Sequence, residues 1–390
     1  MAHIPPTQGG VVIIGSGMAG YGLVRQLRRK DPQIPITMIT ADQGEVYSKP
    51  RLSVAFAEGL GPEELVQQTA EAAAEKFNLT LMRGVRVDGI VTDTKTITTS
   101  VGEIPYDKLV LALGANQIRL PVEAQLPERV YSVNNLNDYR RWRNVIAPGN
   151  RVLIMGAGLI GSEFADDLVG AGMAVEVVDP APMPLGRLLP PALAEKLISA
   201  LQAKGVSFHM GQTVSHLSEH EGHVLANLSK GHTLEVDHVL SAVGLVPNIQ
   251  LAETAGIVVN RGIVVDQQLQ TSATDVFAIG DCAETAAGNL PFVLPLMAQA
   301  GCLAKTLAGE ACQFSLPASP VTVKTKSLPL VVSPPSPESQ GVWSVTGEGS
   351  NLTALFEGDT QDLLGFALSG EATSQWQKLT RELPPLIASR

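Results

Sequence analysis

Hydrophobic runs and glycine-rich turns alternate at the start of the chain. Residues 11–14 are all β-branched, which predicts a short buried strand of a parallel sheet. A glycine-rich turn follows at residues 15–20, and residues 21–30 carry leucines four positions apart, the spacing of an α-helix. Residues 34–40 form a second hydrophobic run. The order strand, turn, helix, strand predicts a βαβ unit.

A second unit of the same kind lies in the middle of the chain. It comprises a strand, a glycine turn, a helix and a strand, at residues 151–155, 156–161, 162–170 and 174–178. Because no fixed short period connects the two copies, we interpret them as duplicated domains. Each copy is followed by a similar closing strand, at residues 109–114 and 239–244.

Two further stretches complete the predicted organisation. Alternating residues between positions 85 and 106 predict a small β-meander. From residue 316 onward the chain is rich in Pro and Ser, with strand-like runs at 321–323 and 330–332. We expect a separate small domain in this C-terminal part.

Composition limits the possible functions. The chain has 390 residues, enough for two or three domains. Its net charge of −10 and its aromatic content of 4% argue against a nucleic-acid partner. No apolar stretch approaches the ~20 residues of a membrane span, and residues 1–10 lack the basic start of a signal peptide. Three cysteines without a C-x-x-C pair argue against a disulfide framework, so we expect a cytoplasmic protein.

The first glycine turn has the G-x-G-x-x-G spacing of a dinucleotide-binding loop. Gly15 permits the tight turn, Gly17 lets the backbone approach a pyrophosphate, and Gly20 permits close packing of helix on strand. The helix N-terminus then faces the phosphates. The alternative, a glycine-rich turn without a ligand, is weakened because the motif has the required strand before it and helix after it. Gly156, Gly158 and Gly161 repeat the spacing in the second unit.

An acidic residue after the second strand of such a unit binds the ribose hydroxyls. Asp42 is the candidate in the first unit, and its alternative role is that of a solvated turn aspartate. Asp179 ends the second strand of the second unit, where a carboxylate favours NADH and repels the 2′-phosphate of NADPH. Arg187 lies near enough in sequence to weaken this preference.

Residues 271–281 distinguish the two loops. They form an apolar strand that begins after Thr271 and ends in Gly280 and Asp281, at a helix start. Here the chain resembles the flavin-dependent pyridine nucleotide disulfide oxidoreductases, whose second FAD motif is T-x-x-x-x-V/I-F/Y-A-x-G-D. The resemblance implies that the first loop binds FAD, that the second loop binds NAD, and that Asp281 binds the ribityl chain. One departure is Leu113, where many relatives have threonine.

The same resemblance implies the fold class. We expect an α/β protein with two Rossmann-like dinucleotide-binding domains, arranged as in glutathione reductase, and a small α+β C-terminal domain. The FAD domain is expected to be split by the NAD domain. The expected bounds are residues 1–116 and 245–315 for the FAD domain, 117–244 for the NAD domain and 316–390 for the C-terminal domain.

A short segment after the first unit narrows the family. Residues 47–53 resemble the Y-x-[RK]-P-x-L-S segment of the NADH-dependent ferredoxin and rubredoxin reductases. Disulfide reductases carry C-x4-C here, whereas this chain has no cysteine before Cys282. Electrons must therefore leave the flavin as single electrons, or pass directly to oxygen or a quinone. Further stretches, among them residues 39–42, 242–245 and 320–325, are similar to bacterial rubredoxin reductases over nearly the whole length.

The resemblance also implies where the chemistry takes place. Lys49 and Glu163 are expected to form an ion pair beside flavin N5, where the nicotinamide delivers hydride. The alternatives are a surface lysine and a helix N-terminal carboxylate. Lys324 is expected near the pyrimidine end of the flavin, or else it is an edge-strand lysine that prevents aggregation. Val87 is expected to hold the adenine and Val293 to touch the flavin. The complete set of expected cofactor contacts is Gly15, Ser16, Gly17, Met18, Ala19, Gly20, Ala41, Asp42, Lys49, Val87, Gly114, Gly156, Gly158, Ile160, Gly161, Glu163, Asp179, Gly244, Asp281, Val293 and Lys324.

The resemblance implies rubredoxin, a small acidic iron–sulfur protein, as the electron acceptor, with alkane hydroxylation as the family's usual setting. The alternatives are a reductase of ferredoxin or flavorubredoxin, and a redox-sensing scaffold. Basic side chains at 25–30 and 140–143 are candidates to meet the partner, although solvated helix faces explain them equally well. His216, His220 and His223 lack a metal-ligand pattern, and we expect no metal site.

Overall fold

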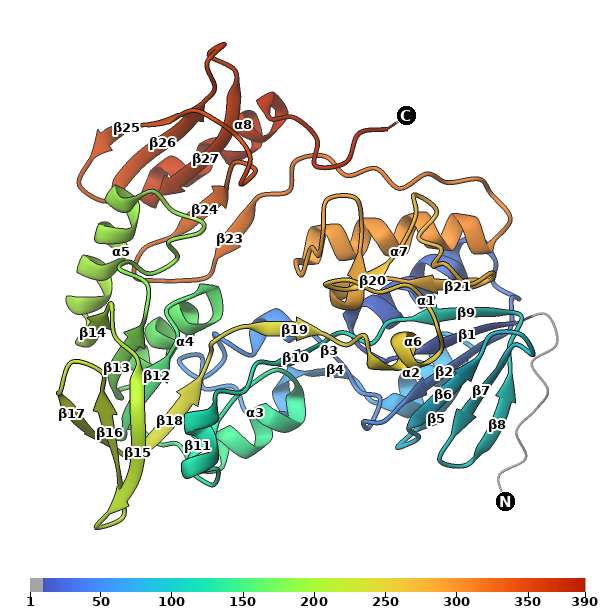
Figure 1. Ribbon diagram of the computed structural model, residues 1–390, viewed down its shortest axis with the longest axis horizontal. Helices are drawn as coiled ribbons and strands as arrows, with labels where there is room; N and C mark the ends of the chain where they lie inside the picture. Colours follow the sequence, from blue (N-terminus) through green and yellow to red (C-terminus); the bar gives the residue numbers. More distant parts are fainter. Residues whose placement is uncertain (1–9, 390) are drawn as a thin grey trace.

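The computed structural model describes residues 10–389. Residues 1–9, on which most of the expectation about a signal peptide depends, lie outside the described residues. Figure 1 shows three parts: a first region built around β1, a second around β12, and a C-terminal sheet joined to the first region by a long extended segment after α7. No helix within residues 10–389 is long and apolar enough to cross a membrane.

The first region is a parallel sheet with the strand order β21-β9-β1-β2-β5. Its strands are β1 (Val11–Ile14), β2 (Ile36–Thr40), β5 (Thr80–Arg83), β9 (Lys108–Leu111) and β21 (Val276–Ala278). β21 pairs with β9 although the whole second region separates them in sequence. This pairing confirms that the first domain is split by the second.

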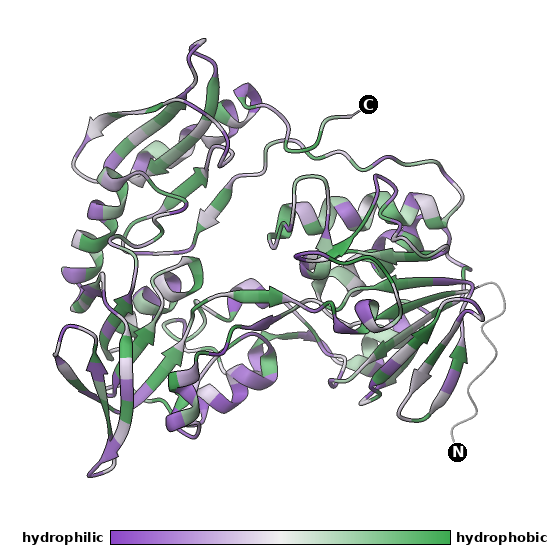
Figure 2. Cartoon of the chain, viewed as in Figure 1, coloured by the Kyte–Doolittle hydropathy of each residue, from purple (hydrophilic) through white to green (hydrophobic). Residues whose placement is uncertain are grey.

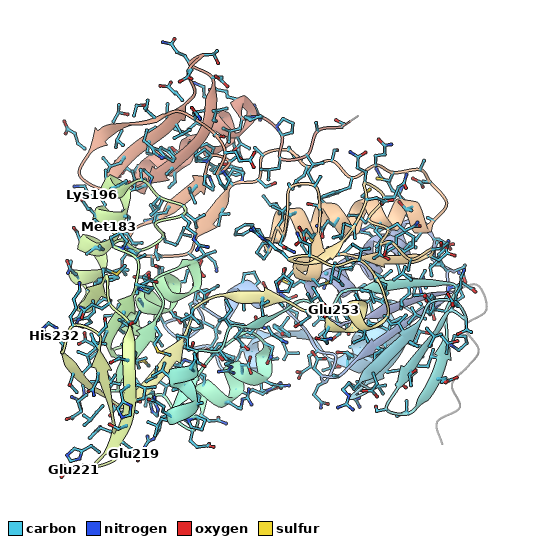
Figure 3. The ribbon with its side chains drawn as sticks, in the orientation of Figure 1. Met183, Lys196, Glu219, Glu221, His232 and Glu253 are labelled. Atoms are coloured by element: carbon cyan, nitrogen blue, oxygen red, sulfur yellow. The ribbon has the colours of Figure 1, made fainter. Side chains whose placement is uncertain are left out.

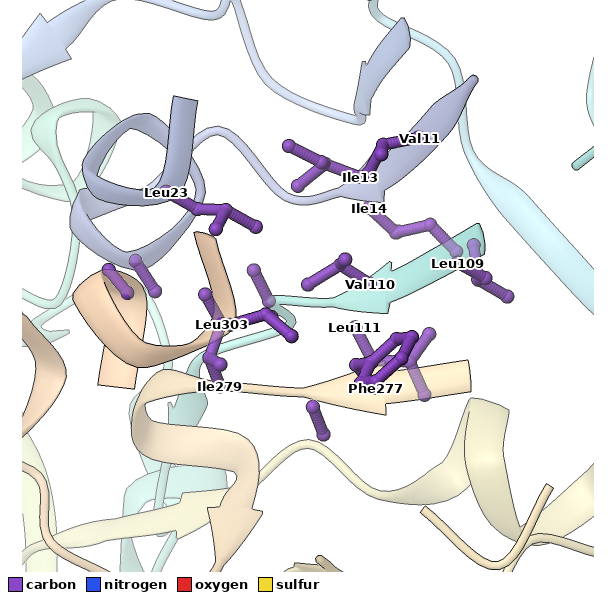
Figure 4. Close-up of a cluster of buried hydrophobic side chains, with 14 of the residues drawn as sticks. Val11, Ile13, Ile14, Leu23, Leu109, Val110, Leu111, Phe277, Ile279 and Leu303 are labelled. Carbon is purple, nitrogen blue, oxygen red and sulfur yellow. The ribbon is translucent and has the colours of Figure 1, made fainter. Parts of the chain in front are cut away.

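Hydrophobic strands and two helices form the core of the first region. All four side chains of β1 are buried, because a parallel sheet is covered on both faces. α1 (Met18–Lys30) and α7 (Val293–Leu307) pack together on one face. Figure 2 shows hydrophobic residues along these strands, and Figure 4 shows Leu23 of α1 and Leu303 of α7 lying over Ile13 and Val110. The expected meander is present as β6 (Val87–Val91), β7 (Thr96–Thr99) and β8 (Gly102–Pro105).

The second region repeats the first. Its parallel sheet has the order β11-β18-β12-β13-β14, and an antiparallel sheet, β15-β16-β17, extends from it. The strands are β11 (Val130–Tyr131), β12 (Arg151–Met155), β13 (Ala174–Asp179), β14 (Val206–Met210), β15 (Val214–His220), β16 (His223–Leu228), β17 (Thr233–Val236) and β18 (His238–Ser241). The helices are α3 (Leu136–Arg143), α4 (Leu159–Gly170) and α5 (Pro191–Gln202).

Two short strands join the regions. β10 (Ala115–Gln117) leaves the first region and pairs antiparallel with β19 (Leu245–Pro247), which returns to it. The crossings lie next to the expected domain bounds at 116 and 244, and those bounds stay a prediction. The remaining elements of the first region are β3 (Val46–Tyr47), β4 (Val66–Gln68), α2 (Ala70–Lys76), α6 (Gln250–Thr254), β20 (Ile263–Val264) and β22 (Ala283–Glu284).

The C-terminal part is an antiparallel sheet with the order β23-β24-β27-β26-β25, followed by α8. These elements are β23 (Val321–Val323), β24 (Leu330–Ser333), β25 (Val342–Glu348), β26 (Asn351–Glu357), β27 (Leu363–Ser369) and α8 (Trp376–Glu382). A bridge between Leu316 and Ile387 then brings the end of the chain back to the linking segment. The expected mixed α+β domain is therefore present.

Candidate functional site

The first glycine turn combines two glycines that the fold requires with one that it does not. A Cβ atom at Gly15 would overlap the carbonyl oxygen of Ala112, and one at Gly20 would overlap the carbonyl oxygen of Gly15. Gly15 also has a φ of +112°, which L side chains rarely adopt. A Cβ atom at Gly17 would meet nothing within 4 Å. The packing of the chain therefore gives no reason for glycine at position 17, whereas close approach of a ligand does.

The second turn repeats this geometry. Gly156 and Gly161 lie against the backbone of Ala242 and of Gly156 respectively, while Gly158 has open space around it. Gly17 and Gly158 are the N-cap residues of α1 and α4, and neither helix start is capped by a side chain. Both N-termini thus present backbone N–H groups beside an open glycine, which suits the pyrophosphate of a dinucleotide.

The acidic residues of the two units occupy different positions. Gly15 N donates to Ile39 O, and Gly156 N donates to Val178 O, so the residues that follow, Thr40 and Asp179, are equivalent. The candidate Asp42 therefore lies two residues beyond the position that Asp179 occupies. Its carboxylate accepts hydrogen bonds from Ser16 Oγ (2.9 Å) and Thr40 Oγ1 (2.7 Å). Asp42 thus holds the side chains that flank the first turn.

Asp179 lies at the edge of the second turn, as expected from its place at the end of β13. Its two carboxylate oxygens accept hydrogen bonds from Ala157 N and Ala181 N, both at 2.7 Å. The carboxylate therefore shapes the glycine turn. A carboxylate at this position is the physical basis of the predicted preference for NADH, which stays a prediction.

The second FAD motif lies against the start of α1. Gly280 has a φ of +78°, and a Cβ atom there would come within 2.8 Å of Ala19 Cβ. Its N–H donates to Gln299 Oε1 of α7 at 2.7 Å. The next residue, Asp281, is paired with Lys49, with 3.6 Å between Nζ and Oδ2. The fold thus brings the first glycine turn, Lys49 and Asp281 together, as a shared FAD site requires.

The expected ion pair between Lys49 and Glu163 is wrong in this structure. The Glu163 side chain is fully buried and pairs with Lys324, with 2.5 Å between Nζ and Oε2. Glu163 also accepts a hydrogen bond from the Lys324 backbone N–H at 3.0 Å. The physical reason is tertiary: the chain after β23 reaches α4, while Lys49 lies beside Asp281.

Ser53 completes this contact. Its hydroxyl donates to Glu163 Oε2 at 2.6 Å, and Lys324 Nζ donates to Ser53 Oγ at 3.2 Å. Ser53 belongs to the first region, Glu163 to α4 of the second, and Lys324 to the C-terminal part. One buried carboxylate therefore joins all three parts of the chain. Sequence reasoning missed Ser53 in this role, although it lies in the segment that carried the family resemblance.

Two further α4 carboxylates that the sequence did not single out also bridge the parts. Asp167 accepts hydrogen bonds from Phe56 N and Ala57 N of the first region, both at 2.9 Å. Burial raises the pKa of Asp167 to about 6, against the lowering effect of those two N–H groups. Asp166 binds the C-terminal part through Ser327 and the backbone N–H of Lys326. Acidic residues near the end of a helix resemble solvated surface, so the sequence carried no signal for this role.

A cavity of about 300 Å³ lies at this three-way junction. Lys204 of the second region and Lys324 and Lys326 of the C-terminal part line it together with Asp166 and Asp167. The Lys326 side chain is 62% exposed and comes within 3.3 Å of Glu58. The junction next to Glu163 is therefore open to solvent and carries lysines from two parts of the chain.

Comparison with known proteins agrees with this arrangement. The family model described as pyridine nucleotide-disulphide oxidoreductase matches residues 9–301. The chain belongs to this family. A second model, described as the rubredoxin binding C-terminal domain, matches residues 313–383. FAD and NAD(H) are accordingly the cofactors of this oxidoreductase, and the open glycines at 17 and 158 fit them.

Relatives match over nearly the full length of this oxidoreductase. It is 44% identical to the rubredoxin-NAD(+) reductase of Alcanivorax borkumensis over 97% of this chain and 99% of that protein. It is 37% identical to the nitric oxide reductase FlRd-NAD(+) reductase of Escherichia coli O9:H4 over 96% and 99%. The crystal structure of the covalent putidaredoxin reductase–putidaredoxin complex superposes with a TM-score of 0.88 and 26% identity, covering 97% of this chain and 94% of that one.

The fold leaves the remaining expected residues in positions from which they could contact FAD or NAD, but it does not test those contacts. Val87 begins β6, and Val293 begins α7 with 40% of its surface exposed. Ile160, in the first turn of α4, is 39% exposed. Gly114 and Gly244 have φ values of +67° and +117°, just beyond the closing strands. Contacts of these residues with FAD or NAD stay predictions.

Most of the basic residues expected to meet a partner are engaged within the oxidoreductase. Arg140 binds Glu45 and Glu63, at 2.8 and 3.0 Å. Arg28 donates to the backbone oxygens of Phe77, Ile34 and Asn78. Their structural roles explain why these arginines occur in the sequence, so they are poor candidates for a docking surface.

His216, His220 and His223 lie on the hairpin formed by β15 and β16. His220 and His223 face each other across the β15–β16 turn, and His223 contacts Asp237 at 2.9 Å. Figure 3 shows Glu219 and Glu221 at the tip of this hairpin, which projects from the molecule. Within the described residues, no group of three or more potential ligands forms a metal site.

Proposed function

We propose that this protein is an NADH-dependent reductase that passes electrons to rubredoxin. When bound, FAD accepts hydride from NADH and releases electrons singly, which is chemistry that the protein itself does not supply. The observation that carries the proposal is the match of residues 313–383 to the rubredoxin binding domain, in a chain whose Lys324 ties that domain to Glu163. The contact connects the partner-binding part with both dinucleotide domains.

The cysteines support direct electron transfer from the flavin. Cys282 lies fully buried beside the second FAD motif, and burial raises the pKa of its thiol to about 12. A thiol in this state is a poor nucleophile. Cys302 and Cys312 line a separate cavity next to Lys30, at the opposite end of α1 from Gly17. A thiol relay between flavin and acceptor therefore has no suitable residue within the described chain.

We infer that the partner docks over the lysine-lined junction. Lys204, Lys324 and Lys326 line the cavity beside Glu163 together with Asp166 and Asp167. Lys324 and Lys326 are paired with Glu163 and Glu58, so the exposed Lys204 and the 62% exposed side chain of Lys326 are the cations that an acidic iron–sulfur protein would meet there. The surface lies on the matched C-terminal domain and next to the residues that join it to the dinucleotide domains. This face replaces the arginines of α3 as the docking candidate.

Two half-reactions test the proposal separately. NADH is mixed anaerobically with the FAD-loaded protein, and the reduced protein is then mixed with rubredoxin or with a ferredoxin. We expect rapid flavin bleaching, and rubredoxin reduction at least about tenfold faster than ferredoxin reduction, which is about 1.4 kcal/mol in the barrier. Faster ferredoxin reduction would reassign the acceptor. Slow bleaching with a long-lived charge-transfer band would instead favour a redox-sensing scaffold.

Charge reversal locates the docking face. Lys326→Glu should slow rubredoxin reduction several-fold and weaken its dependence on ionic strength, because the steering charge is lost. Flavin reduction by NADH should not change. Lys230→Glu, on an exposed turn of the β16–β17 sheet, is the matched control and should leave both half-reactions unchanged. An equal effect of both variants would place docking elsewhere.

Flavorubredoxin is the second candidate acceptor, because the Escherichia coli relative at 37% identity is named nitric oxide reductase FlRd-NAD(+) reductase. Two finer proposals remain. A role in alkane hydroxylation is drawn from the family resemblance, and a cytoplasmic location is drawn from the cysteine pattern of the sequence. Growth of a deletion strain on alkanes would test the first. Fractionation of cells would test the second.

A further inference from the structure

A second cavity lies far from the cofactor loops. It has a volume of about 380 Å³ and lies between the end of α1, one side of α7 and residues 312–315. Gln26 and Lys30 line it from α1, at the opposite end of that helix from Gly17. The 13 residues of α1 span roughly 20 Å at 1.5 Å per residue. The cavity is therefore separate from the dinucleotide site.

Two thiols face this cavity. Cys302 of α7 is buried, with 7% of its surface exposed, whereas Cys312 in the extended segment is half-buried. Burial, and then the hydrogen bond with the Cys312 thiol, raise the pKa of Cys302 to about 12. The two side chains line the same cavity, although ten sequence positions separate them. Cys282 takes no part, because its thiol donates to the Leu111 and Ile279 carbonyls.

The surrounding contacts hold the two thiols together. Glu310 N donates to Lys305 O at 2.9 Å, which folds the chain back on the end of α7 just before Cys312. Lys30 Nζ pairs with Glu310 Oε2 at 2.9 Å and ties the same turn to α1. Cys302 belongs to the hydrophobic core of the first region, and Cys312 packs against that core. These contacts therefore fix both thiols at one cavity.

We propose that Cys302 and Cys312 are a redox modification site, oxidised to a disulfide by hydrogen peroxide. The thiolate of the more exposed Cys312 attacks one peroxide oxygen, the O–O bond breaks, and one water leaves as Cys312 becomes a sulfenic acid. Cys302 sulfur then attacks Cys312 sulfur, the S–O bond breaks, and a second water leaves. Two thiols and one peroxide thus give one disulfide and two waters.

The disulfide would act on the connection between domains. Cys312 comes directly before residues 313–383, which match the rubredoxin binding domain. Cys302 lies one helical turn after Gln299, whose side chain holds Gly280 of the second FAD motif. Oxidation would fasten the start of the connecting segment to α7 and leave the glycine loops untouched. The inference does not depend on the identity of the electron acceptor.

The experiment uses the FAD-loaded full-length protein, treated anaerobically with increasing hydrogen peroxide. Free thiols are then blocked, and the peptides are mapped without and with reductant. We expect a reductant-sensitive peptide that joins Cys302 to Cys312, loss of two thiols per chain, and Cys282 still free. Restored thiol content after reduction is also expected. Oxidation of Cys312 to sulfinic or sulfonic acid without the crosslink would overturn the proposal.

Single-thiol variants test the order of steps. In Cys302→Ser, Cys312 should remain a sulfenic acid that a 1,3-dione reagent traps. In Cys312→Ser, Cys302 should react with peroxide at least about tenfold more slowly than Cys312 does in the wild type, because its raised pKa leaves little thiolate. Cys282→Ser is the control and should form the crosslink at the wild-type rate. Peroxide sensitivity of Cys302 that does not change in Cys312→Ser would contradict the assigned order.

Discussion

At the scale of single residues, the two glycine turns separate what the fold requires from what a ligand requires. A side chain at Gly15 or Gly156 would collide with the neighbouring closing strand, whereas one at Gly17 or Gly158 would meet no protein atom within 4 Å. Within each motif, the second glycine is therefore required by the ligand and not by packing of the protein. Matched substitutions can assign each loop to its cofactor.

Gly17→Val should give a folded protein that purifies without FAD, because the side chain occupies the approach to the pyrophosphate. Gly158→Val should keep its FAD but lose rapid reduction by NADH. The measurements are the ratio of flavin to protein absorbance, circular dichroism, and the rate of flavin bleaching. FAD retained in Gly17→Val, or lost in Gly158→Val, would reverse the assignment of the loops.

At the scale of elements, α4 works as a connector as well as a nucleotide-binding helix. Its first turn faces the second glycine turn, and Glu163, Asp166 and Asp167 then contact the other two parts of the chain. These carboxylates are buried, so each needs hydrogen-bond donors from the neighbouring domain. Movement of α4 relative to the first region would leave Asp167 without partners.

The pKa of Asp167 gives this connection a pH dependence. Its folded pKa of about 6 lies above the ordinary value of 3.8. The contribution of Asp167 to stability is therefore fully present below pH ~4 and is lost as the pH rises through about 6, by on the order of 3 kcal/mol in total. Asp167→Asn removes this titration but also one accepting oxygen.

We expect Asp167→Asn to unfold several degrees below the wild type at pH 4, with the difference shrinking as the pH rises to 7. The reason is that only the wild type acquires a buried charge over this range. Thermal unfolding of both FAD-loaded proteins, at intervals of half a pH unit, measures this difference in unfolding temperature. Parallel curves would mean that Asp167 does not titrate in this window.

At the scale of the whole molecule, one buried carboxylate joins three parts of the chain. Glu163 has no exposed side-chain surface, and its partners Ser53 and Lys324 come from the other two parts. Removal of one member of such a buried pair costs about 3–5 kcal/mol, because the remaining charge has no partner. Removal of both members costs less stability than the sum of the two single removals.

A double-mutant cycle tests this coupling. Glu163→Gln and Lys324→Met should each lower the midpoint temperature of thermal unfolding. The double variant should be more stable than the sum of the two single effects predicts, by at least about 1 kcal/mol. Lys30→Met with Glu310→Gln is the control, because that pair is exposed and should couple weakly. Equal coupling energies in the two cycles would remove the special role of Glu163.

The sequence by itself determined the two βαβ units and the absence of a thiol before Cys282, and its resemblance to a known family implied FAD and NAD as cofactors. The βαβ units depend on local patterns, since the runs of β-branched residues and the glycine spacing act within about thirty residues. The motif from Thr271 to Asp281 also indicated the split domain, which β21 confirms by pairing with β9. Short-range chemistry was enough for each of these conclusions.

Only the tertiary structure decided which charged residues meet. The family resemblance implied that Glu163 pairs with Lys49, but the folded chain brings Lys324 to Glu163 across 161 positions. Asp167 finds its donors 111 and 110 positions away. Cys302 and Cys312 line one cavity only because the chain turns back after α7. A single sequence shows which side chains carry charge or a thiol. Which of them meet is set by the packing of three domains, and that packing leaves no local pattern in the sequence.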